Sequence, residues 1–185
     1  LKFAGTCFKG HDILVAAHSV GGFLVGMAPS NSLIKRVFTM GSQFAYWRDY
    51  AKHKRFAMYL RWHIVMPTLT AIFGYFPGKR LGWLEDTPSG VVRDWISPEP
   101  RFEDIYKSGP QTLSDEERSR LVESFAQVTA PTLAVSMSDD EFGTIPAIHR
   151  LLSYFKNSPS THMRIEPDAV GQPSVGHFAF FNARY

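Results

Sequence analysis

Three side chains that together can perform nucleophilic catalysis follow separate predicted strands or loops of this sequence. Ser19 comes just after the apolar run 13–16, Asp140 follows the run 132–137, and His177 follows a glycine-containing loop. A serine hydroxyl is a poor nucleophile at neutral pH, so it needs an imidazole to accept its proton and a carboxylate to orient that imidazole. Because ligands bind at the carboxyl ends of parallel strands, the sequence predicts a serine–histidine–aspartate triad there.

The residues around Ser19 are typical of a nucleophile elbow, a strained turn between a strand and a helix. Such a turn tolerates almost no side chain two residues before or after the serine, and Ala17 and Gly21 occupy those positions. The helix expected after the turn, 20–27, contains glycines at positions 21, 22 and 26, each costing about 1 kcal/mol of helix propensity relative to alanine. We therefore expect this helix to pack closely against the sheet.

The order of the three residues along the chain is serine, acid, histidine. This order differs from those of chymotrypsin and subtilisin and agrees with that of α/β hydrolases. Two adjacent carboxylates compete for the acid position, because a shift of one residue exchanges a catalytic acid for a turn residue. Asp140 is preferred, and Asp139 stays open as the alternative. His18, next to the serine, is expected either to be a packing residue or to support the turn.

Metal and cofactor chemistry is not indicated. No cysteine and histidine set has the spacing of zinc ligands, so we expect neither a metal nor another cofactor. The only cysteine, Cys7, cannot form an internal disulfide, which favours a reducing compartment and hence the cytoplasm. The remaining histidines are interpreted as surface or core residues: His11, His53, His63, His149 and His162.

Length and composition indicate one globular domain, residues 1–185. The chain is 44% hydrophobic and 20% charged, which is ordinary for a protein with a single core. The formal net charge of +3 comes from scattered lysines and arginines, so a nucleic-acid partner is not expected. The best apolar run, 64–76, is broken by Pro67 and Gly74 and is shorter than the roughly 20 residues of a membrane span. The oligomeric state is not defined by the sequence.

Strands and helices alternate on both sides of an aromatic segment, which indicates an α/β fold with a parallel sheet. Before this segment, the helix 20–27 is closed by Pro29 and leads to a second buried strand at 36–40. After it, Ser114 and Glu117 form a capping box that starts a helix ending near residue 127. The remaining expected elements are a strand at 132–137, a helix with Pro146 near its start, a short strand at 164–166 and a helix at 178–182.

The aromatic segment, residues 43–111, is interpreted as a helical cap inserted between core strands, with helices at 47–64, 67–73 and near 90–95. Tyr46 and Trp47 are predicted to contact the substrate, although buried cap aromatics are commoner than ligand contacts. A basic group shares the segment. Basic and aromatic residues also combine on nucleic-acid and membrane surfaces, but the solvated face of an amphipathic helix is favoured. This group comprises Lys52, Lys54, Arg55 and Arg61.

The chain resembles the carboxyl-terminal two thirds of an α/β-hydrolase-fold protein of the serine-hydrolase or S33-aminopeptidase-like branch. The resemblance rests on Ala-His-Ser-Val-Gly-Gly at 17–22, Ser-Asp-Asp-Glu-Phe at 138–142 and Gly-His-Phe at 176–178. Bacterial α/β hydrolases of this kind also carry the cap motifs found here at 46–48, 74–78 and 81–82. The resemblance implies that Ser19 is the nucleophile, His177 the base and Asp140 the orienting acid. Ala17 departs from the usual first glycine of the elbow.

The same resemblance implies a partial fold. The expected strands correspond to the fifth to eighth of the family's sheet, so the strand at 13–16 should have one unpaired edge. The first residue is Leu1 and not methionine, which indicates that the chain begins within a longer protein. The backbone N–H of Val20 is one expected oxyanion donor, and the second donor is expected upstream. We therefore expect little activity from this chain alone.

The expected reaction is hydrolysis of an ester, thioester or amide with an apolar acyl part, since an aromatic cap would offer a mostly apolar pocket. The partner is then a small-molecule acyl substrate. Two alternatives remain open. The chain could be a non-catalytic module of the same fold that binds a ligand or a protein, or its triad could transfer the acyl group to an acceptor other than water.

Overall fold

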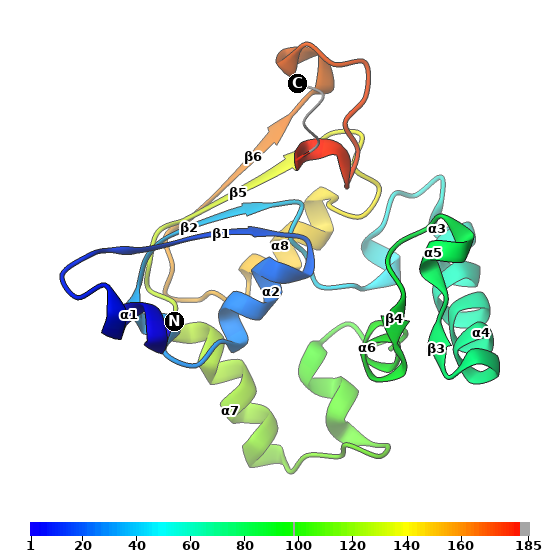
Figure 1. Cartoon of the computed structure of the whole chain (residues 1–185), viewed down its shortest axis with the longest axis horizontal. Helices are drawn as coiled ribbons and strands as arrows, with labels where there is room; N and C mark the ends of the chain where they lie inside the picture. Colours follow the sequence, from blue (N-terminus) through cyan, green and yellow to red (C-terminus); the bar gives the residue numbers. More distant parts are fainter. Residues whose placement is uncertain (98, 182–185) are drawn as a thin grey trace.

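A four-stranded parallel sheet forms the centre of the protein in the computed structural model, which describes residues 1–97 and 99–181 (Figure 1). The sheet order is β1-β2-β5-β6, and each neighbouring pair is parallel. The carboxyl ends of all four strands therefore lie at one edge. The expected α/β class and the contiguous order of the strands are confirmed. The strands are β1 (Ile13–His18), β2 (Ile34–Met40), β5 (Thr132–Met137) and β6 (Ser160–Ile165).

β1 lies at an edge of the sheet, as expected, because β2 is its one partner within the described residues. The face of the sheet that carries Leu14 and Ala16 is open along this strand, and Leu14 is 67% exposed. Parallel sheets are usually covered on both faces. The edge and this face of β1 therefore present uncovered apolar surface.

Three helices pack against the other face of the sheet: α2 (Val20–Met27), α7 (Asp115–Ala126) and α8 (Ile145–Leu152). They form the main core with the strands, in which Val25, Val37, Phe125 and Leu151 are buried. The capping box expected before α7 is present. The Ser114 hydroxyl accepts a hydrogen bond from the Glu117 N–H, and the Glu117 carboxylate accepts one from the Ser114 N–H.

The glycines of α2 explain how closely this helix packs. A β-carbon at Gly22 would overlap Ser42, and one at Gly26 would overlap the ring of Phe125 from α7. At Gly21, by contrast, an added β-carbon would lie 3.6 Å from that of Ala17, an ordinary contact. The close approach expected from the sequence is therefore confirmed at Gly22 and Gly26, whereas Gly21 has room for a methyl group.

Residues 55–96 form a helical lobe beside the sheet (Figure 1) with a core of its own. The side chains of Met58, Trp62, Met66, Phe76 and Val92 are buried in that core. The lobe contains α3 (Arg55–Leu60), a π-helical turn (Arg61–Val65), α4 (Met66–Phe73), β3 (Tyr75–Phe76), α5 (Gly78–Leu81), β4 (Thr87–Pro88) and α6 (Ser89–Trp95). A 3₁₀ turn at Trp47–Asp49 precedes it and another at Phe102–Lys107 follows.

The structure corrects the expected helices of this segment. The helix expected at 47–64 begins only at Arg55, and α3 then continues through the π-helical turn into α4 without a break at Pro67. Proline lacks an N–H and its ring clashes with the carbonyl four residues earlier, and the wider π-helical turn accommodates both effects. The short antiparallel pair β3 and β4 was not expected, because two residues per strand give no periodic signal. The helix expected near 90–95 is α6.

Other boundaries differ in smaller ways. β6 begins four residues before the strand expected at 164–166. The sequence did not predict its first half, Ser-Thr-His, because these residues are polar and give no apolar strand pattern. The expected helix at 178–182 is a 3₁₀ turn at Ala179–Phe181, and residue 182 lies outside the described residues. The chain also contains α1 (Lys2–Cys7) and 3₁₀ turns at Asn31–Leu33 and Pro167–Val170. No helix in the described part of the chain has the length and apolar character to cross a membrane.

Candidate active site

Ser19 is the single residue between the end of β1 and the start of α2. Its backbone has φ 51° and ψ −126°, a positive φ that is uncommon for a residue with a side chain. The Ser19 N–H donates to the Met40 carbonyl at the end of β2 (3.0 Å), and the Ser19 carbonyl accepts from the Gly22 N–H (3.2 Å). These bonds hold a strained strand-to-helix turn at the carboxyl edge of the sheet, which is the geometry of a nucleophile elbow.

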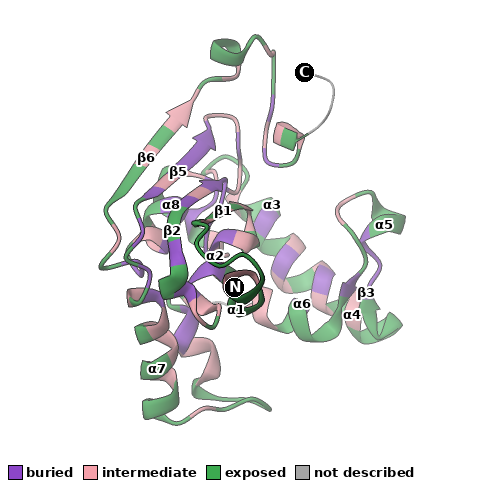
Figure 2. Ribbon diagram, turned by 60° about the vertical axis from the view of Figure 1, so that its left-hand side comes forward, coloured by how far each residue is buried: buried purple, intermediate pink, exposed green. Residues whose placement is uncertain are grey.

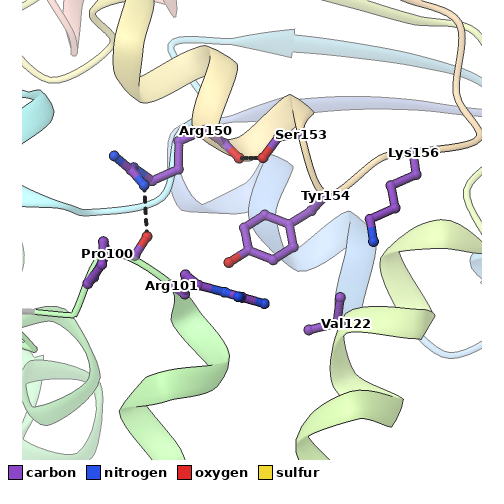
Figure 3. Close-up of a pocket in the computed structure, with 7 residues that line it drawn as sticks. All are labelled: Pro100, Arg101, Val122, Arg150, Ser153, Tyr154 and Lys156. Carbon is purple, nitrogen blue, oxygen red and sulfur yellow. Dashed lines mark hydrogen bonds between the residues drawn. The ribbon is translucent and has the colours of Figure 1, made fainter.

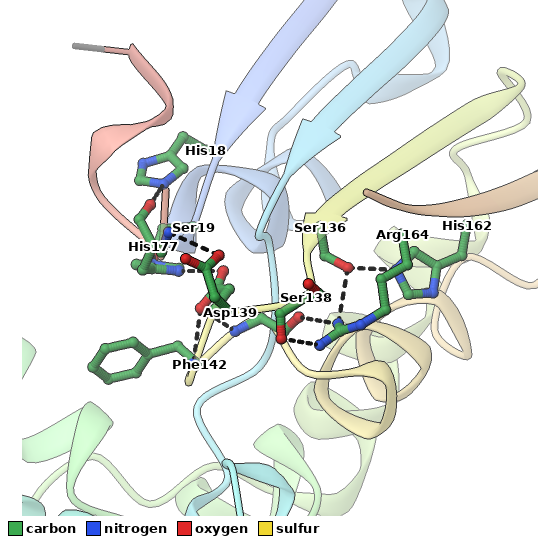
Figure 4. Close-up of polar contacts among 12 residues, drawn as sticks. His18, Ser19, Ser136, Ser138, Asp139, Phe142, His162, Arg164 and His177 are labelled. Carbon is green, nitrogen blue, oxygen red and sulfur yellow. Dashed lines mark hydrogen bonds and ion pairs between the residues drawn. The ribbon is translucent and has the colours of Figure 1, made fainter. Parts of the chain in front are cut away.

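The structure brings Ser19, His177 and Asp140 together although they are far apart in sequence, and Figure 4 labels Ser19 and His177 of this group. The Ser19 Oγ lies 2.8 Å from the His177 Nε2, and the His177 Nδ1 lies 2.8 Å from the Asp140 Oδ2. Both are hydrogen-bond distances. Because a carboxylate only accepts hydrogen bonds, Nδ1 carries the proton and Nε2 presents its lone pair to the serine hydroxyl. This arrangement can activate Ser19 as a nucleophile.

Asp140 is almost fully enclosed, with 4% of its surface exposed. Its Oδ1 accepts hydrogen bonds from the N–H groups of Phe142 and Gly143, each at 2.8 Å. Its Oδ2 faces His177. Three donors thus fix the orientation of the carboxylate, and such charge-assisted bonds are stronger than those between neutral groups.

Two glycines make room for this buried pair. Gly41, just after β2, has φ 56°, and a β-carbon there would lie 2.9 Å from the Asp140 Oδ2 and 3.2 Å from the His177 Nδ1. A β-carbon at Gly143 would overlap the Asp140 carboxylate. Gly41 directly follows the strand predicted at 36–40. Its contact with Asp140 could not be predicted, because the two residues are about 100 positions apart in the sequence.

Asp139, the alternative acid, holds the loop before His177. Its carboxylate accepts hydrogen bonds from the N–H groups of Val175 (2.8 Å) and Gly176 (2.9 Å) and from the Ser174 hydroxyl (2.8 Å). Partial burial alone would raise the pKa of Asp139, but these donors outweigh it and the pKa is lowered. The two neighbouring carboxylates therefore face different partners: Asp140 contacts the imidazole, and Asp139 contacts the loop that carries it.

His18 supports His177 from the side of the serine turn (Figure 4). Its Nε2 lies 2.8 Å from the His177 carbonyl oxygen, so this nitrogen carries a proton and donates it. Burial lowers the pKa of His18, and the hydrogen bond to the His177 carbonyl partly offsets that effect. This contact joins His18 to the backbone of His177, whereas the sequence indicated packing or support of the serine turn.

Arg164 of β6 spans both ends of the loop that carries Asp140 (Figure 4). Its guanidinium donates to the Ser138 carbonyl at 2.8 Å and to the Gly143 carbonyl at 3.3 Å. It also donates to the Ser136 hydroxyl at 3.2 Å. The same hydroxyl lies 2.9 Å from the His162 Nε2. Sequence reasoning missed Arg164, because one arginine in a polar strand gives no sign of the two carbonyls that it reaches.

Two aromatic rings contact the imidazole of His177. The ring centroids of Phe142 and Phe178 lie 5.0 Å and 4.8 Å from that of His177. Phe178 is itself exposed, so it offers apolar surface beside the triad. The two phenylalanine rings therefore place apolar surface directly against the imidazole.

Tyr46 and Trp47 make their described contacts with the fold rather than with the triad. Tyr46 is buried in the main core, and the Arg150 guanidinium lies 4.6 Å from its ring centroid. Trp47 packs edge-on against Tyr59 at 4.9 Å between centroids. Their predicted contact with substrate stays a prediction. Val20 is the first residue of α2, where an N–H has no partner within the helix, and its predicted role as an oxyanion donor also stays a prediction.

The histidines outside the triad do not assemble a metal site. Within residues 1–97 and 99–181, no group of three or more histidine, cysteine or acidic side chains is placed to hold a metal ion. The nearest approach is a pair, with the His162 Nδ1 3.3 Å from the His149 Nε2. Burial and the neighbouring His149 lower the pKa of His162, which favours a neutral imidazole there.

A surface hollow of about 240 Å³ lies away from the triad, and Figure 3 shows its lining. Arg150 on one side is held by an ion pair with Asp49 and by a hydrogen bond to the Pro100 carbonyl at 3.0 Å. The Tyr154 hydroxyl donates to Glu103 at 2.8 Å. The lining comprises Pro100, Arg101, Val122, Arg150, Ser153, Tyr154 and Lys156. Arg101, Arg150 and Tyr154 are thus bound to carboxylates outside the lining, whereas the lining cation Lys156 has no ion-pair partner within the described residues.

No protein-family model matches the chain, and no curated protein matches it. Among solved structures, a monoacylglycerol lipase from Paleococcus ferrophilus is similar, with 15% identity, 89% of this chain covered and a TM-score of 0.43. The esterase domain of a Rhodothermus marinus protein has 16% identity, 95% coverage and a TM-score of 0.47. A meta-cleavage product hydrolase from Pseudomonas fluorescens has 13% identity, 94% coverage and a TM-score of 0.38.

This chain spans 63%, 56% and 60% of the lengths of those three proteins, respectively. At these identities and TM-scores the likenesses give no information on substrate or on residue roles. The chain's own geometry gives the fold. The parallel order β1-β2-β5-β6, the flanking helices and the strained serine turn directly after β1 form a partial α/β-hydrolase fold, as expected from the sequence motifs.

Proposed function

We propose that this chain carries the triad of a serine hydrolase that cleaves an ester, a thioester or an amide through an acyl-enzyme. The observation that supports this proposal is the unbroken hydrogen-bond series from Ser19 through His177 to Asp140, with both steps at 2.8 Å. The strained backbone of Ser19 adds to that support, because strain of this kind is maintained at functional sites.

In the proposed reaction the Ser19 oxygen attacks the substrate carbonyl carbon while the His177 Nε2 accepts the hydroxyl proton. The tetrahedral intermediate then collapses, the bond to the leaving group breaks, and His177 returns the proton to that group. A water molecule attacks the acyl-enzyme in the same way, so the acid is released and Ser19 regains its proton. Asp140 stays ionised throughout and stabilises the imidazolium.

The developing oxyanion needs hydrogen-bond donors, and the Val20 N–H is the proposed donor within this chain. The absence of one such donor costs on the order of 10²–10³ in turnover. We therefore propose slow turnover by the 185-residue chain, with a second donor supplied by a longer protein. A rapid esterase rate from this chain, abolished by Ser19→Ala, would contradict this part of the proposal.

The proposed substrate is a small molecule with an apolar acyl part. Phe142 and Phe178 support this class, because their rings lie beside the imidazole and Phe178 is exposed. We also propose that residues 1–185 act as one domain in which 43–111 is an inserted cap, with Tyr46 and Trp47 near the acyl group. Its proposed location is the cytoplasm, on the basis of the single cysteine, Cys7.

A fluorophosphonate probe tests the nucleophile directly, because it labels only an activated serine. We expect covalent labelling of the wild-type chain and of Ser32→Ala, which changes an exposed serine in the turn before β2. Ser19→Ala should lose labelling completely while its urea unfolding curve stays unchanged. Labelling that persists in Ser19→Ala would contradict the proposal.

The second candidate function is a non-catalytic module that binds a ligand or a protein. The hollow beside Arg150 favours it, since this concave surface lies apart from Ser19. The same probe separates the two candidates. A folded wild-type chain that fails to label would favour the binding module and would contradict the hydrolase.

A further inference from the structure

The first part of the helical lobe and the residues just before it have a charge distribution unlike that of the rest of the chain. The whole sequence is nearly balanced, with 20 lysines and arginines against 17 aspartates and glutamates. Residues 50–84, by contrast, contain six basic residues and no acidic residue: Lys52, Lys54, Arg55, Arg61, Lys79 and Arg80. Residues 50–84 therefore carry a local excess of positive charge, and the first acidic residues of the lobe, Glu85 and Asp86, follow directly after them.

The outer face of the helix formed by α3, the π-helical turn and α4 carries exposed apolar side chains, with the exposed Thr68 as a polar residue among them. Phe56 is 74% exposed, Ile64 52% and Ile72 67%, and Leu60 lies between the first two. Figure 2 shows exposed residues along this helix, opposite the buried side that faces the lobe core. We call these four residues the outer stripe. Large apolar side chains gathered in this way indicate an interaction surface.

The π-helical turn keeps the outer stripe on one face. The residues of the outer stripe are four or eight positions apart in the sequence. In a regular α-helix, side chains four positions apart are rotated by about 40° from each other around the helix axis. The π-helical turn at Arg61–Val65 takes more residues per turn and offsets part of this rotation.

Basic side chains lie at both ends of the outer stripe. Lys52 precedes Phe56, and at the other end the Arg80 guanidinium lies 6.0 Å from the ring centroid of Phe73, next to Ile72. Among the described residues, no carboxylate comes within 4.0 Å of Lys52 or Arg80, whereas Lys54 pairs with Glu141 and Lys79 with Glu85. An apolar stripe between cations is the pattern of a helix that lies in a lipid–water interface.

We propose that the helical lobe docks through the outer stripe on an anionic lipid membrane. The stripe enters the acyl-chain boundary, and Lys52 and Arg80 contact the negatively charged headgroups. A nucleic acid fits this surface less well, because it requires aromatic rings for stacking and three of the four stripe residues are aliphatic. The docking does not depend on the proposed hydrolysis, although it would place the site beside a source of acyl substrates.

Vesicle co-sedimentation of the 185-residue chain tests this docking. Vesicles of phosphatidylcholine with 30% phosphatidylglycerol should bind the chain at low salt, and pure phosphatidylcholine should bind it far less. Ile64→Asp and Ile72→Asp should each weaken binding at least about tenfold, because each removes a buried aliphatic side chain from the interface. Lys52→Gln and Arg80→Gln should each weaken it about fivefold.

Matched controls change equally exposed residues outside the lobe. Leu14→Asp alters the open edge of β1, and Lys35→Gln alters an exposed lysine of β2; both should bind like the wild type. Circular dichroism establishes that every variant is folded. Equal binding to both vesicle types, or binding that only Leu14→Asp reduces, would overturn the proposal. So would dimerisation or oligonucleotide binding that Ile72→Asp abolishes while vesicle binding is retained.

Discussion

The carboxyl edge of the sheet, which carries Ser19, Asp140 and His177 and is called the triad edge below, differs from the helical lobe in how its side chains are held. At the triad edge, the Asp140 carboxylate has three donors and the Asp139 carboxylate three more. In the lobe, the buried indole N–H of Trp62 has no acceptor within the described part of the chain, and large apolar side chains such as Ile72 face solvent. The first region is fixed by polar contacts, and the second is held by its apolar core.

This difference shows where each region can accept change. Removing one hydrogen-bond donor from a buried charge costs a large amount of folding free energy, because the charge is left partly without a partner. An exposed apolar residue makes few contacts within the fold, so its replacement mainly alters what the surface binds. Substitutions at the triad edge should therefore change reactivity strongly, and substitutions in the lobe should leave the site intact.

The largest expected effect on reactivity comes from substituting the two neighbouring acids, Asp139 and Asp140, one at a time. Asp140→Asn should slow fluorophosphonate labelling of Ser19 by on the order of 10⁴, because an amide no longer holds the imidazole in the reactive tautomer. Asp139→Asn should slow it far less, since Asp139 contacts the loop 174–176 and not the ring. Equal losses in the two variants would show that the acids are not distinct in role.

Removing the Arg164 clamp should have the next largest effect. Arg164→Met loses the bonds to the Ser138 and Gly143 carbonyls, and the resulting shift of Asp140 should slow labelling by about tenfold to about 100-fold. The resonance of the His177 Nδ1 proton should shift as well. Arg164→Lys should recover part of the rate because one bond can re-form. An unchanged resonance in Arg164→Met would contradict a positioning role.

Alanine substitutions at two glycines, one in the main core and one in the lobe, test how tightly each region is packed. Gly26→Ala should lower the free energy of unfolding by about 1–3 kcal/mol, because the added methyl overlaps the Phe125 ring. Gly90→Ala lies in α6 with open space around it and should raise the free energy of unfolding by up to about 1 kcal/mol. Urea denaturation measures both values. A neutral Gly26→Ala would mean that α2 and α7 separate more readily than their contact indicates.

The smallest effect is a pH dependence shared by both regions. Burial lowers the pKa of His18 at the triad edge and of His63 in the lobe, and a backbone hydrogen bond partly offsets the effect in each. The unfolded chain then binds more protons below about pH 6.5. The free energy of unfolding should therefore fall as the pH drops from 7 to 5.

Urea unfolding at pH 5 and pH 7 measures this slope. His18→Gln and His63→Gln should each flatten it, whereas His11→Gln, at an exposed position, serves as the control. If the slope is the same in all three variants, neither of the two partly buried histidines causes it. A flatter slope in only one of the two would show which region is coupled to pH.

Patterns confined to a few neighbouring residues were sufficient to predict much of the fold. The small residues around Ser19 predicted the turn between β1 and α2, and Ser114 with Glu117 predicted the start of α7. The apolar run at 132–137 predicted β5. Each of these features depends on steric or hydrogen-bonding effects that act within one turn or one strand. Pro67 was misleading because the irregular turn before it is not visible in such local patterns.

The tertiary structure alone decided which groups meet. The sequence left Asp139 and Asp140 as competing acids, because a register difference of one residue cannot be resolved locally, and the fold directs only Asp140 to His177. The contacts of Gly41 and Arg164 with the acid loop likewise join distant parts of the chain. The sequence determined Ser19 and its strained turn, whereas packing of strands over 100 residues apart determined the partners of that serine.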